Sequence, residues 1–337
     1  MMTTMQALVY EGPKMMNVRT VDVPTPGADE VLIKVAYSGI CGSELSGYLG
    51  QNALRKPPLI MGHEFSGTLE HIGDEAARLY PDLHIGQTVT ANPLLSCRRC
   101  AYCLSGRQQL CPQRKLLSAT LPGSNAQWVT VRADAVLPLP DGMPLTTAAL
   151  TEPAACAVHA VGLAAPRPHE TAVVVGAGPI GLLLIQALQD SGVKTVYVAD
   201  LNRERLAMAQ DLGADALTLD QSEFNGQFDM AFEAVGVDAT RQGCLRLLRP
   251  GGRVFWLGLH EANSELPVND MIRREIIGYG SFAYTALDFS RALAALAVGR
   301  LYLKDTWTRI EPLERGSACF EELLAGSAVA KIWLSPE

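Results

Sequence analysis

Long basic runs, an export signal and an unbroken apolar span are all missing from this sequence of 337 residues. The net charge is −7 and no cluster of Lys or Arg stands out, which argues against nucleic acid as a partner. The first residues lack a basic segment followed by an apolar one, so no signal peptide is predicted. The most apolar stretch, 172–188, is broken by glycines and Pro179 and falls short of the roughly 20 residues that span a membrane. We therefore expect a cytoplasmic protein that binds neither nucleic acid nor membrane.

Disulfides are not expected either, although the sequence has eight cysteines. Five of them have spacings typical of metal sites and no export signal precedes them, which favours a reducing compartment. Four form the pattern C-x2-C-x2-C-x7-C, at Cys97, Cys100, Cys103 and Cys111. Thiolates at this spacing wrap one tetrahedral zinc ion, and a site closed by four thiolates leaves no position for a substrate. This segment therefore predicts a structural zinc site.

The hydrophobic pattern changes from a β-rich part to an α/β part. Residues 1 to about 155 have strand-like alternation, for example over 30–37, with frequent Gly and Pro. Apolar strands and helices then alternate, which implies a doubly wound parallel sheet covered on both faces. A helix over 287–298 and a strand over 331–334 end the chain. Strands are predicted at 171–175, 195–200, 228–232 and 253–257, and helices at 179–191, 203–212 and 239–248.

A glycine motif at 176–181 follows a predicted strand and opens a predicted helix, the context in which such a motif binds a dinucleotide. Gly176 permits a tight turn, Gly178 lets the backbone approach a pyrophosphate, and Gly181 lets helix and strand pack closely. Pro179 and Ile180 begin the helix, whose N-terminus offers unpaired N–H groups to phosphates. A glycine-rich turn without a ligand is the alternative, and the strand, the helix and the acidic residue that follows disfavour it.

That acidic residue is Asp200, which lies nineteen residues after Gly181 at the end of the second predicted strand. A carboxylate at this place accepts hydrogen bonds from an adenosine ribose and repels a 2′-phosphate, so it favours NAD over NADP. Arg203 and Arg205 argue in the other direction, because an arginine can accommodate that phosphate.

A second set of metal ligands is suggested by Cys41, His63 and Glu64, which offer a thiolate, an imidazole and a carboxylate. Three protein ligands with one open position are typical of catalytic zinc, and Zn²⁺ with one thiolate and one carboxylate sums to zero charge. Glu152 is a fourth candidate ligand. Because two bound carboxylates would make the site net negative, we expect Glu152 to bind only without substrate or to hold a zinc-bound water. A single cysteine or histidine is more often an ordinary buried or hydrogen-bonded residue. The prediction of a metal site therefore depends on Cys41, His63 and Glu64 occurring together.

Together these motifs resemble the zinc-dependent medium-chain dehydrogenase/reductase family, in its polyol (sorbitol/L-iditol) dehydrogenase-like branch. Residues 39–44 resemble the family's G-I-C-G-S-D and residues 62–67 its G-H-E-x-x-G. The four-cysteine segment has the spacing of its structural zinc site, Glu152-Pro153 resembles the E-P before its nucleotide domain, and 176–181 with Asp200 resembles its NAD site. The resemblance covers nearly the whole chain.

The resemblance implies a GroES-like catalytic domain from residues 1–155 and 286–337 and a Rossmann NAD-binding domain from residues 156–285. It implies reversible hydride transfer between NAD and a polyol or another secondary alcohol, with one catalytic and one structural Zn²⁺ in each subunit. It also suggests a homodimer or homotetramer, in which the apolar segment 276–278 is a candidate interface element.

The resemblance also assigns roles to individual residues. Cys41, His63 and Glu64 would bind the catalytic zinc, Ser43 would be the first hydroxyl of a proton relay, and Glu44 would orient His63. The branch usually has aspartate at position 44, and the histidine expected a few residues after the serine is absent, with Ser46 near that position. These departures bear on the substrate more than on the reaction type.

Several alternatives stay open. Threonine, sugar-acid and sugar-phosphate dehydrogenases of the same family differ only in substrate. A zinc-free quinone or enone reductase would need no thiolate at Cys41, and a non-catalytic NAD sensor would need neither an open zinc site nor Ser43. Tyr48, Leu116, Trp128 and Phe282 are expected to contribute to the walls of the substrate pocket.

Overall fold

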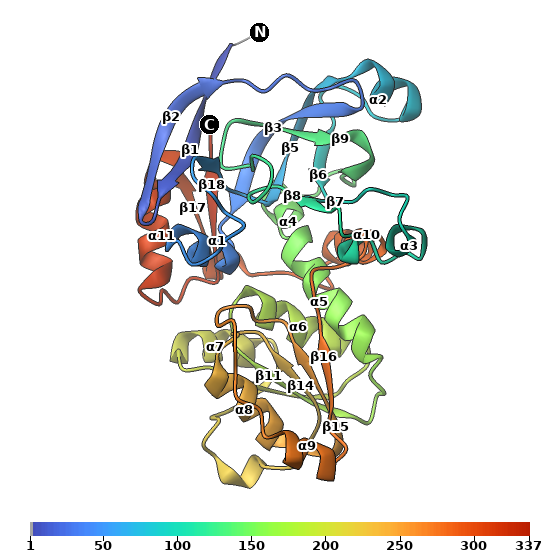
Figure 1. Cartoon of the computed structure of the whole chain (residues 1–337), viewed down its shortest axis with the longest axis vertical. Coiled ribbons are helices and arrows are strands. Elements are labelled where there is room, and N and C mark those ends of the chain that lie inside the picture. Colours follow the sequence, from blue (N-terminus) through green and yellow to red (C-terminus); the bar gives the residue numbers. More distant parts are fainter. Residues whose placement is uncertain (1–2) are drawn as a thin grey trace. The chain divides into compact units, whose positions relative to one another are not determined.

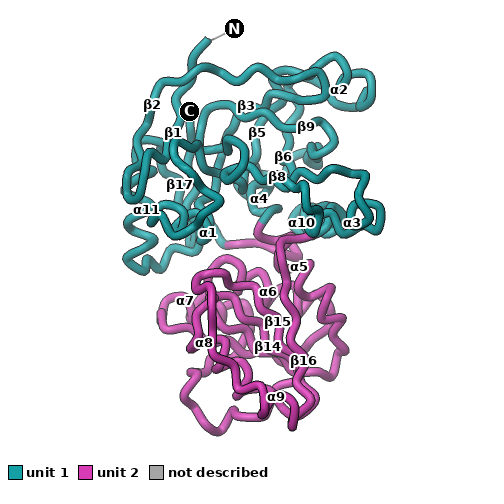
Figure 2. Tube along the Cα trace, in the orientation of Figure 1, with its two compact units in different colours: residues 1–152, 285–298, 304–337 teal, residues 153–284, 299–303 magenta. Residues whose placement is uncertain are grey.

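The computed structural model describes residues 3–337 and divides into two compact units (Figures 1 and 2). Unit 1 consists of Met1–Glu152, Thr285–Val298 and Lys304–Glu337, and unit 2 of Pro153–Tyr284 and Gly299–Leu303. The predicted domain boundaries at residues 155 and 285 lie within three residues of the unit boundaries at 152 and 284. The prediction did not include residues 299–303 in the second unit. Among the described residues, no helix is both long enough and apolar enough to cross a membrane.

Unit 1 is built mainly from antiparallel strands (Figure 1). Its largest sheet has the order β10-β6-β5-β3-β18-β17, and β9 also pairs with β3. A smaller sheet has the order β2-β1-β4, and β7 pairs with β8. The strands are β1 Thr4–Gly12, β2 Met15–Asp22, β3 Glu30–Gly39, β4 Leu59–Ile60, β5 Glu64–Ile72, β6 Thr88–Ala91, β7 Leu94–Leu95, β8 Lys115–Leu116, β9 Trp128–Arg132, β10 Val136–Pro138, β17 Thr308–Pro312 and β18 Lys331–Ser335.

Short helices join these strands. They are α1 Gly42–Tyr48, α2 Asp74–Leu79, α3 Ala101–Leu104, α4 Leu145–Ala149, α10 Ala286–Ala297 and α11 Gly316–Leu324, while α5 Thr151–Ala164 begins in unit 1 and continues into unit 2. One core cluster of unit 1 packs Tyr48 of α1 against Phe320 of α11, with ring centroids 5.4 Å apart. This contact ties the C-terminal part of the chain to the segment that follows Cys41.

The last strand, β18, brings a distant part of the chain beside β3. Trp333 of β18 lies opposite Gly39 of β3, and on the other side of β3 Glu64 of β5 also lies opposite Gly39. A Cβ atom at Gly39 would overlap the carboxylate of Glu64 and press on the Trp333 ring. The glycine therefore lets side chains from β5 and β18 meet over β3.

Unit 2 is a parallel sheet with the strand order β13-β12-β11-β14-β15-β16. Val173 and its neighbours in β11, and every residue of β14, are buried, as the apolar runs predict. The α/β fold class is therefore confirmed. β13 and α9 have no predicted counterpart, because each is too short to show a clear period, and β16 overlaps the apolar segment 276–278. The elements are β11 Thr171–Val175, α6 Pro179–Asp190, β12 Thr195–Ala199, α7 Arg203–Asp211, β13 Asp215–Leu217, β14 Phe228–Glu233, α8 Asp238–Leu247, β15 Leu248–Trp256, α9 Val268–Arg273 and β16 Ile277–Gly280.

Candidate functional site

Three of the predicted zinc ligands come together in unit 1. Cys41 immediately precedes α1, His63 precedes β5, and Glu64 begins β5. The thiol sulfur, an imidazole nitrogen and a carboxylate oxygen all lie within 4.8 Å of one another. Zinc binds such ligands at about 2.0 to 2.3 Å, so small side-chain movements are enough to bring all three onto one ion. The donor set therefore fits a zinc ion with an open position.

The ring of His63 is held by Glu44, a residue of α1 that is fully buried. Glu44 Oε1 lies 2.7 Å from His63 Nδ1 and accepts hydrogen bonds from the Gly62 N–H at 2.8 Å and the Ser118 hydroxyl at 2.5 Å. Burial alone would raise the pKa of Glu44, but His63, Arg55 and Ser118 outweigh it and lower that pKa to about 2. Because an ionised carboxylate only accepts, Nδ1 carries a proton and Nε2 is left for a metal.

The protonation of His63 follows from the same neighbours. Burial opposes a charge on the ring, yet the negative charges of Glu44 and Cys41 raise the pKa of His63 well above its ordinary value. A metal ion that bound Nε2 would therefore replace a proton there, as metal ligation by imidazole requires.

A buried lysine that the sequence analysis missed holds the third ligand. Lys331 Nζ lies 2.6 Å from Glu64 Oε2 and donates to the Ile40 carbonyl at 3.1 Å. Burial would lower the pKa of Lys331, but Glu64 and Cys41 raise it above its ordinary value, so the ammonium form is retained. Lys331 engages one oxygen of Glu64 and leaves the other for a metal. The available signal was a lone cation at the start of an apolar strand.

The hydroxyl of Ser43, the predicted first member of the proton relay, lies beside the ligands. Ser43 Oγ donates to Cys41 Sγ at 3.4 Å and accepts from Arg55 Nη2 at 3.1 Å. Ser46, which stands near the position of the missing histidine, instead donates its hydroxyl hydrogen bond to the Ser43 backbone carbonyl at 2.9 Å. Ser43 is therefore surrounded by a predicted ligand and a guanidinium, and Arg55 is a second residue that sequence reasoning missed.

Two expected site residues are not members of this group of three. Glu152, the second residue of α5, is not among the three side chains whose ligand atoms lie within 4.8 Å of one another, although its charge contributes to the raised pKa of Lys331. Its role at the metal stays a prediction. Tyr48 was expected in a pocket wall, and this was wrong: it is buried, and its hydroxyl donates to Glu321 at 2.7 Å. An aromatic residue near a site more often belongs to the hydrophobic core, and here the ring of Tyr48 packs against Phe320 of α11.

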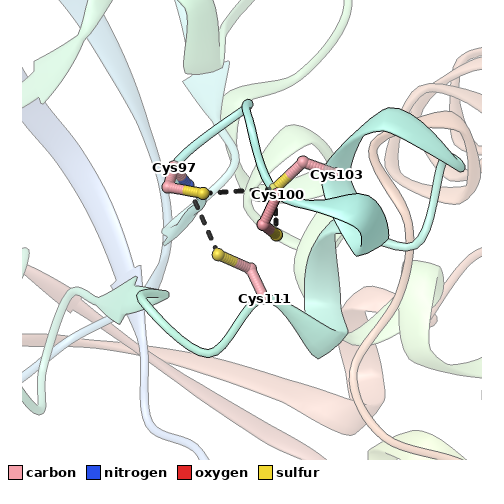
Figure 3. A group of neighbouring side chains, drawn as sticks. All are labelled: Cys97, Cys100, Cys103 and Cys111. Carbon is pink, nitrogen blue, oxygen red and sulfur yellow. Dashed lines mark hydrogen bonds between the residues drawn. The ribbon is translucent and has the colours of Figure 1, made fainter.

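The four cysteines of the predicted structural site converge on one point (Figure 3). Sγ of Cys103 lies 3.5 Å from Sγ of Cys100 and 3.9 Å from Sγ of Cys97. Four sulfurs on one tetrahedral zinc at about 2.3 Å stand about 3.8 Å apart. Backbone N–H groups of Arg99 and Cys100 lower the pKa of the Cys97 thiol to about 6, whereas burial and the neighbouring thiols raise the pKa of Cys100, so the four thiols do not all ionise together without a cation between them. The segment thus fits a closed four-thiolate zinc site.

The glycine motif in unit 2 has the geometry of a phosphate cradle. Gly176 has φ +102°, a left-handed conformation that glycine adopts without strain, and a Cβ at Gly181 would overlap the carbonyl of Gly176. Gly178 is the N-cap of α6, with Pro179 and then Ile180 in its first turn. A Cβ at Gly178 would meet no protein atom within 4 Å, so the space in front of this helix end is open. The residues present fit a dinucleotide pyrophosphate.

Asp200 follows β12 and links the glycine motif to the next helix. Its carboxylate accepts hydrogen bonds from the N–H groups of Ala177 at 2.7 Å and Asn202 at 2.8 Å. Arg205 lies in the first turn of α7, where its N–H donates to the Asn202 side chain at 3.1 Å, and the Arg203 side chain is exposed. A carboxylate held between the motif and α7 is suited to the hydroxyls of an adenosine ribose.

Known proteins resemble the chain over both units. A family model described as an alcohol dehydrogenase GroES-like domain matches residues 27–141, and one described as a zinc-binding dehydrogenase matches residues 179–298. Sorbitol dehydrogenase of Bacillus subtilis is 33% identical, covering 95% of this chain and 94% of its own. D-arabitol-phosphate dehydrogenase of Enterococcus avium is 31% identical, covering 98% and 97%. The structure of a zinc-binding dehydrogenase from Sinorhizobium meliloti bound to NADP superposes with a TM-score of 0.91 at 28% identity, covering 99% of this chain and 100% of that one.

Proposed function

The chain belongs to the zinc-dependent medium-chain dehydrogenase/reductase family, in its polyol dehydrogenase-like branch, and we propose that it transfers a hydride between NAD and a polyol or another secondary alcohol. The reaction converts a secondary alcohol and NAD⁺ into a ketone, NADH and a proton, and is reversible. The observation that carries this proposal is the convergence of Cys41, His63 and Glu64 beside the hydroxyl of Ser43.

A catalytic zinc ion and NAD would supply the central chemistry, and a second zinc ion would have a structural role. Cys41, His63 and Glu64 would hold a catalytic zinc, the four cysteines a structural zinc, and the glycine motif with Asp200 the NAD. When bound, the catalytic zinc supplies Lewis acidity toward an alcohol oxygen, and NAD supplies a hydride acceptor. The protein's own residues have to orient the ligands, balance the buried charges and carry the alcohol proton away.

Ser43 is suited to moving that proton. Because Arg55 can only donate, Ser43 Oγ must accept from it, and its own hydrogen, which points to Cys41, is left to pass on to solvent. In alcohol oxidation Ser43 Oγ would accept the hydroxyl proton of the substrate while its own hydrogen passes on toward solvent. Glu44 would keep the His63 ring in one tautomer throughout, and Lys331 would keep Glu64 in place.

We further propose NAD as the preferred cofactor. Asp200 supports this, since a carboxylate beside the ribose would repel the additional phosphate of NADP. The similar structure from Sinorhizobium meliloti holds NADP, so the preference has to be measured. Replacing Asp200 with serine should shift the preference toward NADP, and an unchanged ratio of the two kcat/KM values would contradict this assignment.

We propose a cytoplasmic homodimer or homotetramer. β16 is an edge strand of the unit 2 sheet, and all four of its residues are exposed, including Ile277 and Tyr279. An apolar edge strand readily pairs with a second chain. Sedimentation of the wild type and of Ile277→Lys tests this idea: a monomeric wild type would contradict it.

The main test is the initial rate of NAD⁺ reduction with sorbitol, xylitol, galactitol, threonine, 2,3-butanediol, sugar acids and sugar phosphates, each with and without a zinc chelator. Turnover that the chelator abolishes supports the proposal. Turnover that survives complete zinc removal would contradict it. Binding of NADH without turnover of any substrate would favour the non-catalytic sensor.

A further inference from the structure

The loop between α1 and β4 exposes an apolar side chain and buries a charged one. Leu54 is 64% exposed, and Ala53 and Lys56, which flank Leu54 and Arg55, are exposed as well. Arg55 alone in 53–58 is buried, with 5% of its surface accessible. A surface loop that exposes its leucine and buries its arginine has no hydrophobic reason to do so, since burial of a guanidinium is costly.

The interior of unit 1 has room for this side chain. A Cβ at Gly47 of α1 would overlap the Arg55 side chain at Cδ, so the glycine leaves the space through which the arginine passes. At its end, Arg55 Nη2 donates to Ser43 Oγ at 3.1 Å, and Ser43 Oγ lies 3.4 Å from Cys41 Sγ. The guanidinium therefore ends two short contacts away from a predicted zinc ligand.

The charge of Arg55 is not matched within the protein. Its Nε is buried and has no hydrogen-bond partner, and no carboxylate in the described residues 3–337 lies within ion-pair distance of it. Glu44, whose charge it does feel, makes its hydrogen bonds with His63, Gly62 and Ser118 instead. A buried guanidinium without an ion pair has donors and charge to offer to the oxygens of a carboxylate or a phosphate.

We propose that Arg55 binds an anionic group of the substrate, a carboxylate or a phosphate ester carried a few atoms from the hydroxyl that is oxidised. The proposal rests on the proposed dehydrogenase function and narrows its substrate to acidic alcohols. The planar guanidinium matches the oxygens of either group, and its position next to Ser43 keeps the anion close to the reacting carbon. The rival role is purely positional: Arg55 would only direct the hydrogen bond of Ser43.

The first experiment compares neutral and anionic substrates with the wild-type holoenzyme. Sorbitol is measured against sorbitol 6-phosphate and against gluconate, which separates the phosphate from the carboxylate. We expect kcat/KM for at least one anion to exceed that for sorbitol by roughly 10-fold or more, mainly through a lower KM. If sorbitol is used as well as both anions, this inference is overturned while the dehydrogenase function stands.

Variants then separate recognition from positioning. Arg55→Ala should reduce turnover of both substrate types, because Ser43 loses a donor, but should reduce kcat/KM for the anion roughly 10- to 100-fold more. Compared with Arg55→Ala, Arg55→Lys should recover part of the anion preference, since it restores the positive charge but not the paired N–H donors of the guanidinium. Lys56→Ala is the matched control from the same loop and should leave the preference unchanged. Equal losses for neutral and anionic substrates in Arg55→Ala would show that Arg55 only positions Ser43.

A binding measurement covers the case in which none of these alcohols is turned over or Arg55→Ala fails to fold. Inorganic phosphate is titrated calorimetrically into zinc-loaded protein saturated with NADH, which would fill the phosphate cradle of unit 2. We expect wild type and Lys56→Ala to bind phosphate, and Arg55→Gln, which keeps a polar side chain but removes the charge and the guanidinium, to bind it at least roughly 10-fold more weakly. Equal binding by Arg55→Gln and wild type would overturn the inference.

Discussion

The two cysteine-containing sites of unit 1 are assembled in opposite ways. The four-thiol site comes from a single segment, 97–111, and its sulfurs contact one another directly. The mixed site takes its ligands from the start of α1 and of β5, and its supporting groups Ser118, Lys331 and Arg55 from three further segments. The first site is local, and the second exists only when the fold of unit 1 is complete.

This difference reflects what each site has to do. A metal that only stiffens a loop needs ligands and nothing else, and four thiolates satisfy it. A metal that acts on a substrate needs ligands with fixed tautomers and charges, so Glu44 and Lys331 each make a short buried contact with one of its ligands. The comparison predicts that damage to the two sites will have different consequences.

The largest expected effect is the loss of turnover in Cys41→Ala. Loss of one ligand should empty the mixed site and remove Lewis acidity worth several kcal/mol, a fall in kcat of roughly 1,000-fold or more. Zinc content should fall by about one equivalent, and NADH affinity, measured by fluorescence, should change little because the glycine motif lies in the other unit. Cys319→Ala, a buried core cysteine of the same unit, is the control and should keep its zinc and its activity. Wild-type turnover in Cys41→Ala would break the comparison.

The second effect is on stability rather than on chemistry. Cys103→Ser should lose the metal of the four-thiol site and, with it, folding free energy on the order of 3 to 4 kcal/mol, since metal binding and folding are coupled. Urea denaturation followed by far-UV circular dichroism measures the loss. The protein that remains folded should still hold zinc at Cys41 and should oxidise alcohol. A stable but inactive Cys103→Ser would mean that the two sites are not independent.

The same difference between local and long-range assembly decides which parts of the structure could be predicted from the sequence. The four-thiol site, the glycine motif and the strands of unit 2 were predictable because their residues are neighbours in the chain or follow one period. The convergence of Cys41, His63 and Glu64 was predicted as a set, from residue chemistry and family resemblance. The groups that support the set were out of reach. Lys331 meets Glu64 only because β18 pairs with β3, and no spacing in the sequence encodes that contact.

The third prediction addresses that contact. Lys331→Met keeps most of the length of the side chain but leaves the carboxylate of Glu64 buried without its cation, which should cost about 3 kcal/mol of folding free energy in zinc-free protein. The double variant Lys331→Met with Glu64→Gln should recover much of this loss, because the uncompensated charge is gone. Urea midpoints of the wild type, the two single variants and the double variant form the cycle. Additive losses would show that the two residues do not depend on each other.

The smallest effect is expected from Glu44, which would act on a bound metal only through His63. Glu44→Gln should weaken zinc binding at the mixed site roughly 10- to 100-fold, measured by competition with a chelator, and should leave the four-thiol site unaffected. Glu44→Asp, the residue usual in this branch, should lose less because the charge remains.

The acid dependence of the zinc-free protein supplies a second readout for the same residue. The pKa of Glu44 in the folded state is lowered from 4.5 to about 2. The stabilisation by its charge is therefore present above about pH 4.5 and is lost as the pH falls through that window toward about 2. Glu44→Gln has no such charge to lose, so its unfolding free energy should fall less steeply than that of the wild type between about pH 5 and pH 3. Equal slopes would mean that the carboxylate is not held as an anion, and the orientation of His63 would then need another cause.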